Sequence, residues 1–236
     1  MAKEVVVKAS TIAKRKKRYT KTKVIISIIL TVMIFLFIIL SIIYKGGHFT
    51  ITLDQRLAVD NHIVIYDDNE IKESKRRLTA RELTFMDNIS IDWIPKNIDT
   101  EANGSHNGEN YIAYTFYIEN EGEETINYWY TIIIDDVIKN VDNAARVMIY
   151  KNGEKTVYAK TNSLTNEAEK DTKPFFSKDK AVLEQRNNFA PGDIDKYTVV
   201  IWLEGDDPDC TDNILGGEIK MHMEIREEYY ETNENK

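Results

Sequence analysis

The residues best suited to chemistry gather in one short acidic segment, residues 204–212, which reads EGDDPDCTD. Asp206, Asp207, Asp209 and Asp212 place several hard carboxylate oxygens close together, and such oxygens are the ligands that Ca²⁺ prefers. Their spacing does not follow the EF-hand pattern. The segment therefore indicates a candidate calcium site, and we predict no other cofactor.

The same segment has a simpler structural interpretation. Short Asp and Thr side chains accept backbone N–H groups in tight turns, and Pro208 fixes one backbone dihedral. Because crowded carboxylates repel one another, burial of the segment would favour a bound cation. The sequence leaves both interpretations open, and a calcium titration followed by thermal unfolding distinguishes them.

No other set of side chains has a spacing typical of catalysis. The four histidines do not form an H-E-x-x-H or similar ligand pattern, and the sequence has neither a G-x-S-x-G motif nor a glycine-rich phosphate loop. Cys210 is the only cysteine, so an intrachain disulfide is excluded, and its isolation in the sequence gives no indication of a nucleophile. We therefore expect no enzymatic activity.

The elements that must position the acidic segment begin with one long apolar run, Val24–Ile43, which carries no charged residue. At about 1.5 Å per residue, a helix of about 20 residues spans about 30 Å, the thickness of the hydrocarbon core of a bilayer. A buried helix of a soluble protein would show a polar face, and this run is apolar on all sides. We predict a transmembrane helix over residues 24–44, with the lipid bilayer as partner.

The charge on either side of this run predicts its orientation. Residues 1–23 hold nine Lys and Arg against one Glu, a net charge of +8, whereas the rest holds 22 basic and 38 acidic residues, a net charge of −16. The positive-inside rule places residues 1–23 in the cytoplasm as a basic tail and the C-terminal domain outside the cell membrane. A cleaved signal peptide is the alternative. The length of the run and the lack of a small-residue cleavage site after Ile43 favour an uncleaved signal anchor.

Beyond the run, apolar residues alternate with period two, as in strands with one buried face. The candidate strands are Phe49–Leu53, His62–Tyr66, Ile89–Ile94, Ile112–Ile118, Tyr128–Ile134, Arg146–Tyr150, Lys155–Lys160, Tyr197–Leu203 and Ile219–Ile225. An Asn-Gly pair between Tyr150 and Lys155 is the strongest short signal for a β-hairpin. About nine strands with few helical stretches predict a mainly β fold, an antiparallel β-sandwich or jelly roll.

Two segments interrupt this alternation. Ile71–Met86 and Lys178–Asn187 have helix-forming composition, and we expect one or two short helices there. The polar C-terminal end, residues 229–236, is expected to form a disordered tail. The predicted domains are therefore the basic tail 1–23, the transmembrane helix 24–44, the extracellular sandwich 45–228 and this C-terminal tail.

Several motifs in the C-terminal part together resemble the TasA/camelysin-like envelope proteins of Gram-positive bacteria. They are Phe189-Ala-Pro-Gly-Asp193, Tyr197–Glu204, Asp207–Asp212 and Gly216–Lys220. The resemblance implies a jelly-roll domain exported through an N-terminal apolar segment, and in some members assembly into biofilm fibres in which one subunit donates a strand to the next. The chain departs from this pattern because it lacks a clear cleavage site.

By this resemblance, Phe49, Ile51 and Leu53 in the first strand after the membrane form a contact between subunits, and an ordinary edge strand is the alternative. We predict a non-enzymatic structural or interaction role at the cell envelope, in matrix, fibre or partner contacts, through self-association or other envelope proteins. An extracellular ligand- or calcium-binding module that uses residues 204–212 is the alternative. Nucleic acid is not expected as a partner, because the acidic domain repels phosphate.

Overall fold

The computed structural model describes residues 9–44 and 48–227 of the chain. The chain divides into two compact units, residues 1–46 and residues 47–236. The predicted disordered tail at 229–236 and the first part of the predicted basic tail, residues 1–8, lie outside the described residues.

The described part of the N-terminal unit is one helix, α1 (Ala9–Tyr44). Its segment Lys16–Leu40 contains a window of mean hydropathy 3.0 with no buried side chain, so it is long and apolar enough to cross a membrane. The predicted helix at 24–44 is confirmed as helical. It begins earlier, within the basic residues, because Lys and Arg are good helix formers. A membrane anchor and a signal sequence share this length and composition.

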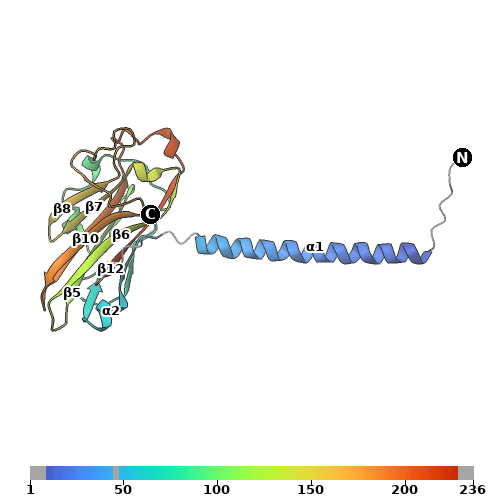
Figure 1. Cartoon of the computed structure of the whole chain (residues 1–236), viewed down its shortest axis with the longest axis horizontal. Helices are drawn as coiled ribbons and strands as arrows, with labels where there is room; N and C mark the ends of the chain where they lie inside the picture. Colours follow the sequence, from blue (N-terminus) through green and yellow to red (C-terminus); the bar gives the residue numbers. More distant parts are fainter. Residues whose placement is uncertain (1–8, 45–47, 228–236) are drawn as a thin grey trace, which may run out of the picture. The chain divides into compact units, whose positions relative to one another are not determined.

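The second unit consists of two β-sheets (Figure 1), which confirms the predicted mainly β fold. The five-stranded sheet has the order β10-β6-β12-β1-β3. Its strands are β1 (Thr50–Leu53), β3 (Arg77–Thr79), β6 (Ile126–Ile138), β10 (Lys180–Phe189) and β12 (Glu218–Arg226). Neighbouring strands are antiparallel except β1 and β12, which run parallel.

The seven-stranded sheet has the order β2-β5-β11-β7-β8-β9, and β4 also pairs with β5. Its strands are β2 (Ile63–Tyr66), β4 (Gly104–Ser105), β5 (Tyr111–Asn120), β7 (Ala145–Lys151), β8 (Glu154–Ala159), β9 (Lys173–Pro174) and β11 (Ile194–Leu203). The predicted hairpin is confirmed as β7 and β8. Asn152 and Gly153 at its turn have φ angles of 51° and 88°, the left-handed region that an Asn-Gly pair adopts readily.

The main core lies between the two sheets and follows from the period-two alternation. Ile132 and Met223 from the five-stranded sheet, and Phe116 and Val199 from the seven-stranded sheet, are all completely buried in it. Each such side chain contributes about 1.5–3 kcal/mol relative to its exposed state. The alternating pattern in the sequence thus identifies the inward faces of these strands correctly.

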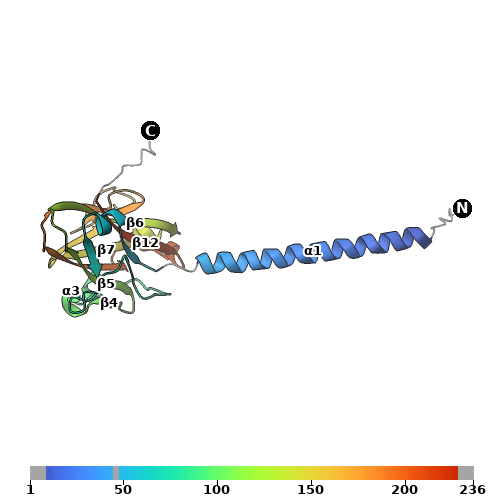
Figure 2. The same ribbon diagram turned by 90° about the horizontal axis from the view of Figure 1, so that it is seen from below.

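A second, smaller apolar cluster covers the outer face of the seven-stranded sheet. Ile89, Ile94 and Ile98, from the segment that leads into helix α3 (Ile98–Glu101), pack with Val200 and Trp202 of β11. Figure 2 shows α3 and β4 beside β5. Strands β5, β7 and β11 are therefore apolar on both faces, because both faces are covered.

The two predicted helices are wrong in position. Ile71–Met86 is mostly irregular and includes β3, whereas Lys178–Asn187 falls largely in β10. The predicted strand Ile89–Ile94 is also wrong, since it forms a single β-bridge at Ile89 followed by the 3-10 helix η1 (Ile91–Trp93). The short helices of the domain are instead α2 (Gln55–Val59) and α3, together with the 3-10 helices η1, η2 (Val141–Asn143) and η3 (Asp212–Ile214).

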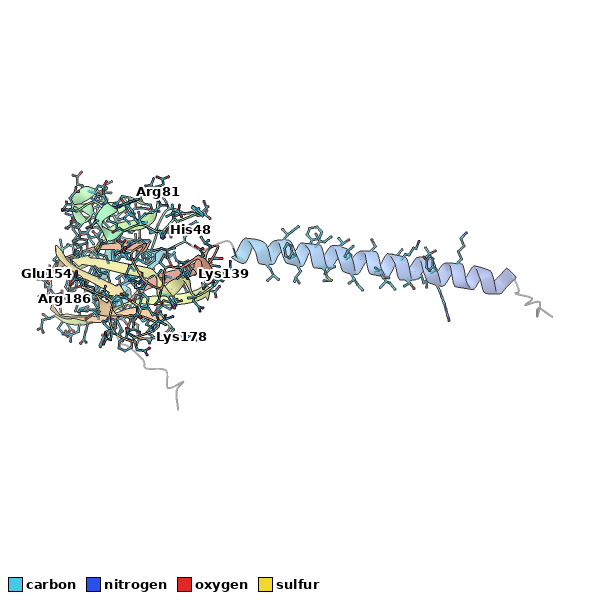
Figure 3. The ribbon with its side chains drawn as sticks, turned by 90° about the horizontal axis from the view of Figure 1, so that it is seen from above. His48, Arg81, Lys139, Glu154, Lys178 and Arg186 are labelled. Atoms are coloured by element: carbon cyan, nitrogen blue, oxygen red, sulfur yellow. The ribbon has the colours of Figure 1, made fainter. Side chains whose placement is uncertain are left out.

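A buried polar cluster joins the two sheets and explains why β10 is a strand despite its charges. Asp195 of β11 accepts hydrogen bonds from Arg186 Nε at 2.9 Å, Tyr128 Oη at 2.7 Å and Asn152 Nδ2 at 2.8 Å. Burial raises the pKa of Tyr128 well above its usual value, so its hydroxyl keeps the proton that it donates. Figure 3 shows Arg186 and Glu154 at one end of the sandwich and Lys139 at the other.

Candidate functional site

A cavity of about 830 Å³ lies on the outer face of the seven-stranded sheet, beside the acidic segment. Its floor is formed by Met148 of β7, Val157 of β8 and Trp202 of β11. Met148 is paired with both Val157 and Val200, so the floor follows the cross-strand register. Residues 90–96, 169–172 and 204–207 contribute the walls.

Two charged residues that line the cavity are paired with each other. The Arg146 guanidinium binds the Asp207 carboxylate, and the two side chains are 5% and 1% exposed. A second guanidinium nitrogen of Arg146 donates to the carbonyl of Ala145 at 3.2 Å, and Asp207 Oδ1 accepts from the backbone N–H of Asp209 at 2.7 Å. A buried charge is tolerated only with such partners, so the pair holds the acidic segment against β7.

Glu204 connects the start of η1 to the end of β11. Its carboxylate accepts from the Trp202 indole N–H at 3.0 Å, from the Ile91 backbone N–H at 3.1 Å and from the Asp206 backbone N–H at 3.3 Å. Glu204 is buried, and these donors satisfy both of its oxygens. The wall formed by residues 90–96 is thereby fixed relative to the floor.

The structure brings together two of the four predicted calcium ligands. Asp207 and Asp209 lie with Glu169, which comes from a different loop, and one carboxylate oxygen of each lies within 4.8 Å of the others. Asp206 and Asp212 are exposed and are not members of this group. The sequence contains no spacing signal for Glu169, because the loop that carries it reaches the acidic segment only through the fold.

The hydrogen bond from the Asp209 backbone N–H to Asp207 Oδ1 fits the turn interpretation of the acidic segment, and the carboxylates of the group have further partners. Asp209 accepts from the backbone N–H and the hydroxyl of Ser163, at 2.8 and 2.5 Å. Asn162 Nδ2 donates to Glu169 at 3.1 Å. With Asp207 bound to Arg146, each carboxylate of the group has a partner within the protein, and calcium binding there stays a prediction.

The predicted subunit contact lies inside the sandwich. Phe49, Ile51 and Leu53 are 3%, 0% and 7% exposed and pack in the main core. β1 pairs with β12 on one side and with β3 on the other, so the alternative of an edge strand is wrong. Nothing in a single chain tests an exchange of β1 between subunits, and that contact stays a prediction.

A histidine outside the cavity has two carboxylate neighbours. His222 Nδ1 lies 2.8 Å from Asp135 Oδ2, and its Nε2 lies 3.4 Å from Glu224 Oε1. Asp135 is the extra residue of an irregularity between β6 and β12, which turns its side chain toward the histidine. The hydrogen bond to Glu224, followed by that to Asp135, raises the pKa of His222 in spite of partial burial.

Known proteins show little similarity to this chain. No protein-family model matches the chain, and no curated protein matches it. Among solved structures, a β-glucosidase from Kluyveromyces marxianus in complex with glucose matches at 12% sequence identity and a TM-score of 0.23. The match covers 68% of this chain and 15% of the glucosidase, and at that TM-score it does not define a shared fold.

Proposed function

We propose that the chain is a membrane-anchored protein that presents its β-sandwich outside the cell for non-enzymatic structural or partner contacts at the cell envelope. The observation that supports this most is the cavity beside the acidic segment, because its buried charged residues are paired within the fold. A catalytic acid or base must reach a proton of the substrate. Arg146, Asp207 and Glu204 instead hold the shape of the cavity, as expected for a binding surface.

The composition of the cavity favours a protein segment as the partner. Its floor is apolar, and its rim carries charges of both signs, including Lys96, Lys155, Asp92 and Asp206. An apolar side chain of the partner would be buried at the floor while charged neighbours pair with the rim. Such an apolar centre with a polar rim is the usual anatomy of a protein interface.

The edges of the sandwich favour contact through this face over strand addition. β10, the long edge strand, has register shifts near both ends and directs Glu184 and Arg186 toward the other sheet. The other edge strands are short: β3 has three residues, β2 has four and β9 has two, one of them Pro174. Bulges, inward charges, proline and short length all block pairing between edges.

The proposed orientation is tested by labelling cysteines in intact cells with a membrane-impermeant maleimide. In a Cys210→Ser background, Lys155→Cys at the exposed start of β8 is expected to react at once. Thr20→Cys in the basic part of α1 is expected to react only after the membrane is permeabilised. The reverse result, or equal labelling of both, would contradict the orientation.

The anchor is tested by the N-terminal peptide of the protein recovered from the membrane fraction. An uncleaved signal anchor predicts that residues 1–23 are retained and that alkaline carbonate does not extract the protein. A first residue beyond Tyr44 would show that the segment is removed and that the sandwich is released.

The cavity is tested by filling it. Val157→Arg is expected to weaken binding of the full-length protein, in detergent, to isolated cell envelopes, because a charged side chain would occupy the apolar floor. Thr156→Arg serves as the matched control, since Thr156 is the neighbouring strand residue and does not line the cavity. Equal binding by both variants and the unchanged protein would place the contact elsewhere.

Calcium binding is the second candidate function, favoured by the approach of Glu169 to Asp207 and Asp209. Since Arg146 already neutralises Asp207, we expect binding at about millimolar calcium, as in extracellular modules. The melting temperature is then expected to rise in calcium for the unchanged protein and for Asp212→Asn, and to stay constant for Glu169→Gln. A melting temperature of the unchanged protein that does not respond to millimolar calcium excludes the site.

A further inference from the structure

A lysine, an asparagine and an aspartate meet at the base of the β7–β8 hairpin. Lys160 Nζ lies 2.7 Å from Asn143 Oδ1 and 2.6 Å from Asp142 Oδ2. Lys160 directly follows β8, whereas Asp142 and Asn143 belong to η2, which precedes β7. An amine and a carboxamide can react to form an amide bond between side chains, and a neighbouring carboxyl group can move the protons that this reaction requires.

The frame around these three residues is rigid. Ala159 is paired with Arg146 in the β7–β8 ladder, which fixes the backbone next to Lys160. On the other side, Val141 and Ala144 are buried and hold η2 against the sandwich. Contact between reacting groups that are held in this way replaces a bimolecular encounter, and effective molarities for well-oriented groups reach about 10⁵ M or more.

Asp142 has a feature that an ordinary ion pair does not require. Its side chain is only 8% exposed, and Oδ1 is buried without a hydrogen-bond donor among the described residues. Buried carboxylate oxygens normally have a donor. The unpaired oxygen leaves one side of the carboxyl group free to hold a proton while the other side contacts the lysine.

We propose that Lys160 and Asn143 become joined by an internal amide bond, with Asp142 as the catalytic acid and base. Asp142 takes a proton from the Lys160 ammonium, and the neutral Nζ attacks Cγ of Asn143, which is one bond from the Oδ1 that it contacts. The carboxyl proton stabilises the oxygen of the tetrahedral intermediate. The Cγ–Nδ2 bond then breaks, Nδ2 takes up the two protons that Nζ has released and leaves as an ammonium ion, and Asp142 returns to the carboxylate form.

This bond would close the chain between residues 143 and 160 at the open end of the β7–β8 hairpin. Residues 161–172 follow directly and carry Glu169 and the Ser163 contact to Asp209. The link would therefore anchor the loop that forms one wall of the cavity. It does not depend on the proposed binding function, because only Lys160, Asn143 and Asp142 take part.

The intact mass of the full-length protein, purified in detergent, tests the proposal. The unchanged protein is expected to be lighter than its sequence by one molecule of ammonia. Its peptide map is expected to contain a branched peptide that joins Asn143 to Lys160, with no tryptic cleavage after Lys160. Lys160→Arg, which keeps the charge, and Asp142→Asn, which keeps the shape, are expected to have their sequence masses.

Lys155→Arg, at the other end of β8, is the matched control and is expected to lose ammonia as the unchanged protein does. An unchanged protein that still has its sequence mass after prolonged incubation overturns the proposal, whatever the variants do. Loss of water with a peptide that joins residues 142 and 160 would overturn Asn143 as the acceptor. Loss of ammonia by Asp142→Asn would overturn the catalytic role of Asp142.

Discussion

At the scale of single residues, Asp206 and Asp207 are adjacent in sequence and opposite in environment. Asp207 is buried with Arg146, whereas Asp206 is exposed. Removing one partner of a buried pair leaves an unpaired charge and costs about 3–5 kcal/mol. We expect Asp207→Ala to lower the free energy of unfolding by about that amount, and Asp206→Ala to change it by less than about 0.5 kcal/mol.

Denaturant titration of both variants measures this difference. The comparison has a built-in control, because both substitutions remove one negative charge from the same loop. Equal effects would show that Asp207 contributes through the charge of the loop alone. They would contradict a specific contribution of the Arg146 contact.

His222 makes stability depend on pH. Its pKa is raised above the ordinary value of 6.5 by the hydrogen bond to Glu224 and then by Asp135, so the folded state binds the proton more tightly than the unfolded state does. This contribution is fully present below pH 6.5 and is lost as the pH rises through the raised pKa. We expect the melting temperature to fall over that interval, and the fall to be smaller in His222→Gln.

Glu224 gives the opposite dependence at lower pH. The hydrogen bond from His222 is the main cause that lowers the Glu224 pKa below 4.5. Its contribution is therefore present above 4.5 and is lost as the pH falls through the lowered pKa, which separates the two effects in a pH series. If the melting temperature of His222→Gln fell above pH 6.5 as much as that of the unchanged protein, the fall could not be assigned to His222.

The sequence predicts the acidic segment as a candidate site, but it does not identify all of the residues that meet there in the fold. Asp207 and Asp209 stand out because they are crowded in one loop. Glu169 and Arg146 are ordinary charged residues in their own neighbourhoods, and they reach the segment only because β7 pairs with β11 and the 160–172 loop folds over it. Contacts of this kind depend on sheet topology, which local spacing does not contain.

At the scale of elements, the β7–β8 turn is the clearest agreement between sequence and structure. Gly153 has a φ of 88°, and a Cβ added there would meet no atom within 4 Å, so the cost of Gly153→Ala comes from the backbone alone. A left-handed conformation costs a residue with a Cβ about 1–2 kcal/mol. We expect Gly153→Ala to lower the free energy of unfolding by about 1 kcal/mol, measured by denaturant titration.

The exposed Lys155→Ala in the same hairpin serves as a control and is expected to change stability by less than about 0.5 kcal/mol. A neutral Gly153→Ala would mean that the turn relaxes to a different conformation.

The helix predicted at Lys178–Asn187 is wrong because the segment forms most of strand β10. Lys, Glu, Gln and Arg favour a helix when their intrinsic propensity is considered alone. In the fold, Glu184 accepts a hydrogen bond from Tyr158 at 3.1 Å, and Arg186 is paired with Asp195. Partners on the opposite sheet make charged inward positions acceptable, and the local sequence of β10 contains no signal for them.

At the scale of the whole molecule, β1 is the segment through which strand exchange is predicted. Thr52 faces Glu224 across the parallel pair of β1 and β12. Neighbouring strands are about 4.8 Å apart, within the range of a disulfide. We expect Thr52→Cys with Glu224→Cys, in a Cys210→Ser background, to lock β1 into its own sandwich and to abolish any assembly that depends on exchange of β1.

Sedimentation of the locked protein before and after reduction measures the effect, and the Cys210→Ser protein is the control. Assembly that survives the lock would show that subunits meet without exchange of β1. An unfolded locked protein would be recognised by its circular dichroism, and Thr50→Cys with His222→Cys then provides a second lock in the same register.

The parallel pairing of β1 with β12 also determines the response of the sandwich to tension. A pull between residue 48 and residue 227 draws Thr50 and Arg226 apart along the strands, which shears the four register pairs of β1 and β12 together. A pull between residues 125 and 227 instead acts at the neighbouring ends of β6 and β12, an antiparallel pair that opens one bond at a time.

Forced unfolding depends on the rate of opening. We therefore expect single-molecule stretching to require a higher force in the first geometry than in the second. A domain held at its N-terminal strand and pulled from its C-terminal strand would thus be mechanically stronger in the direction of that pull than a domain opened from the β6 end.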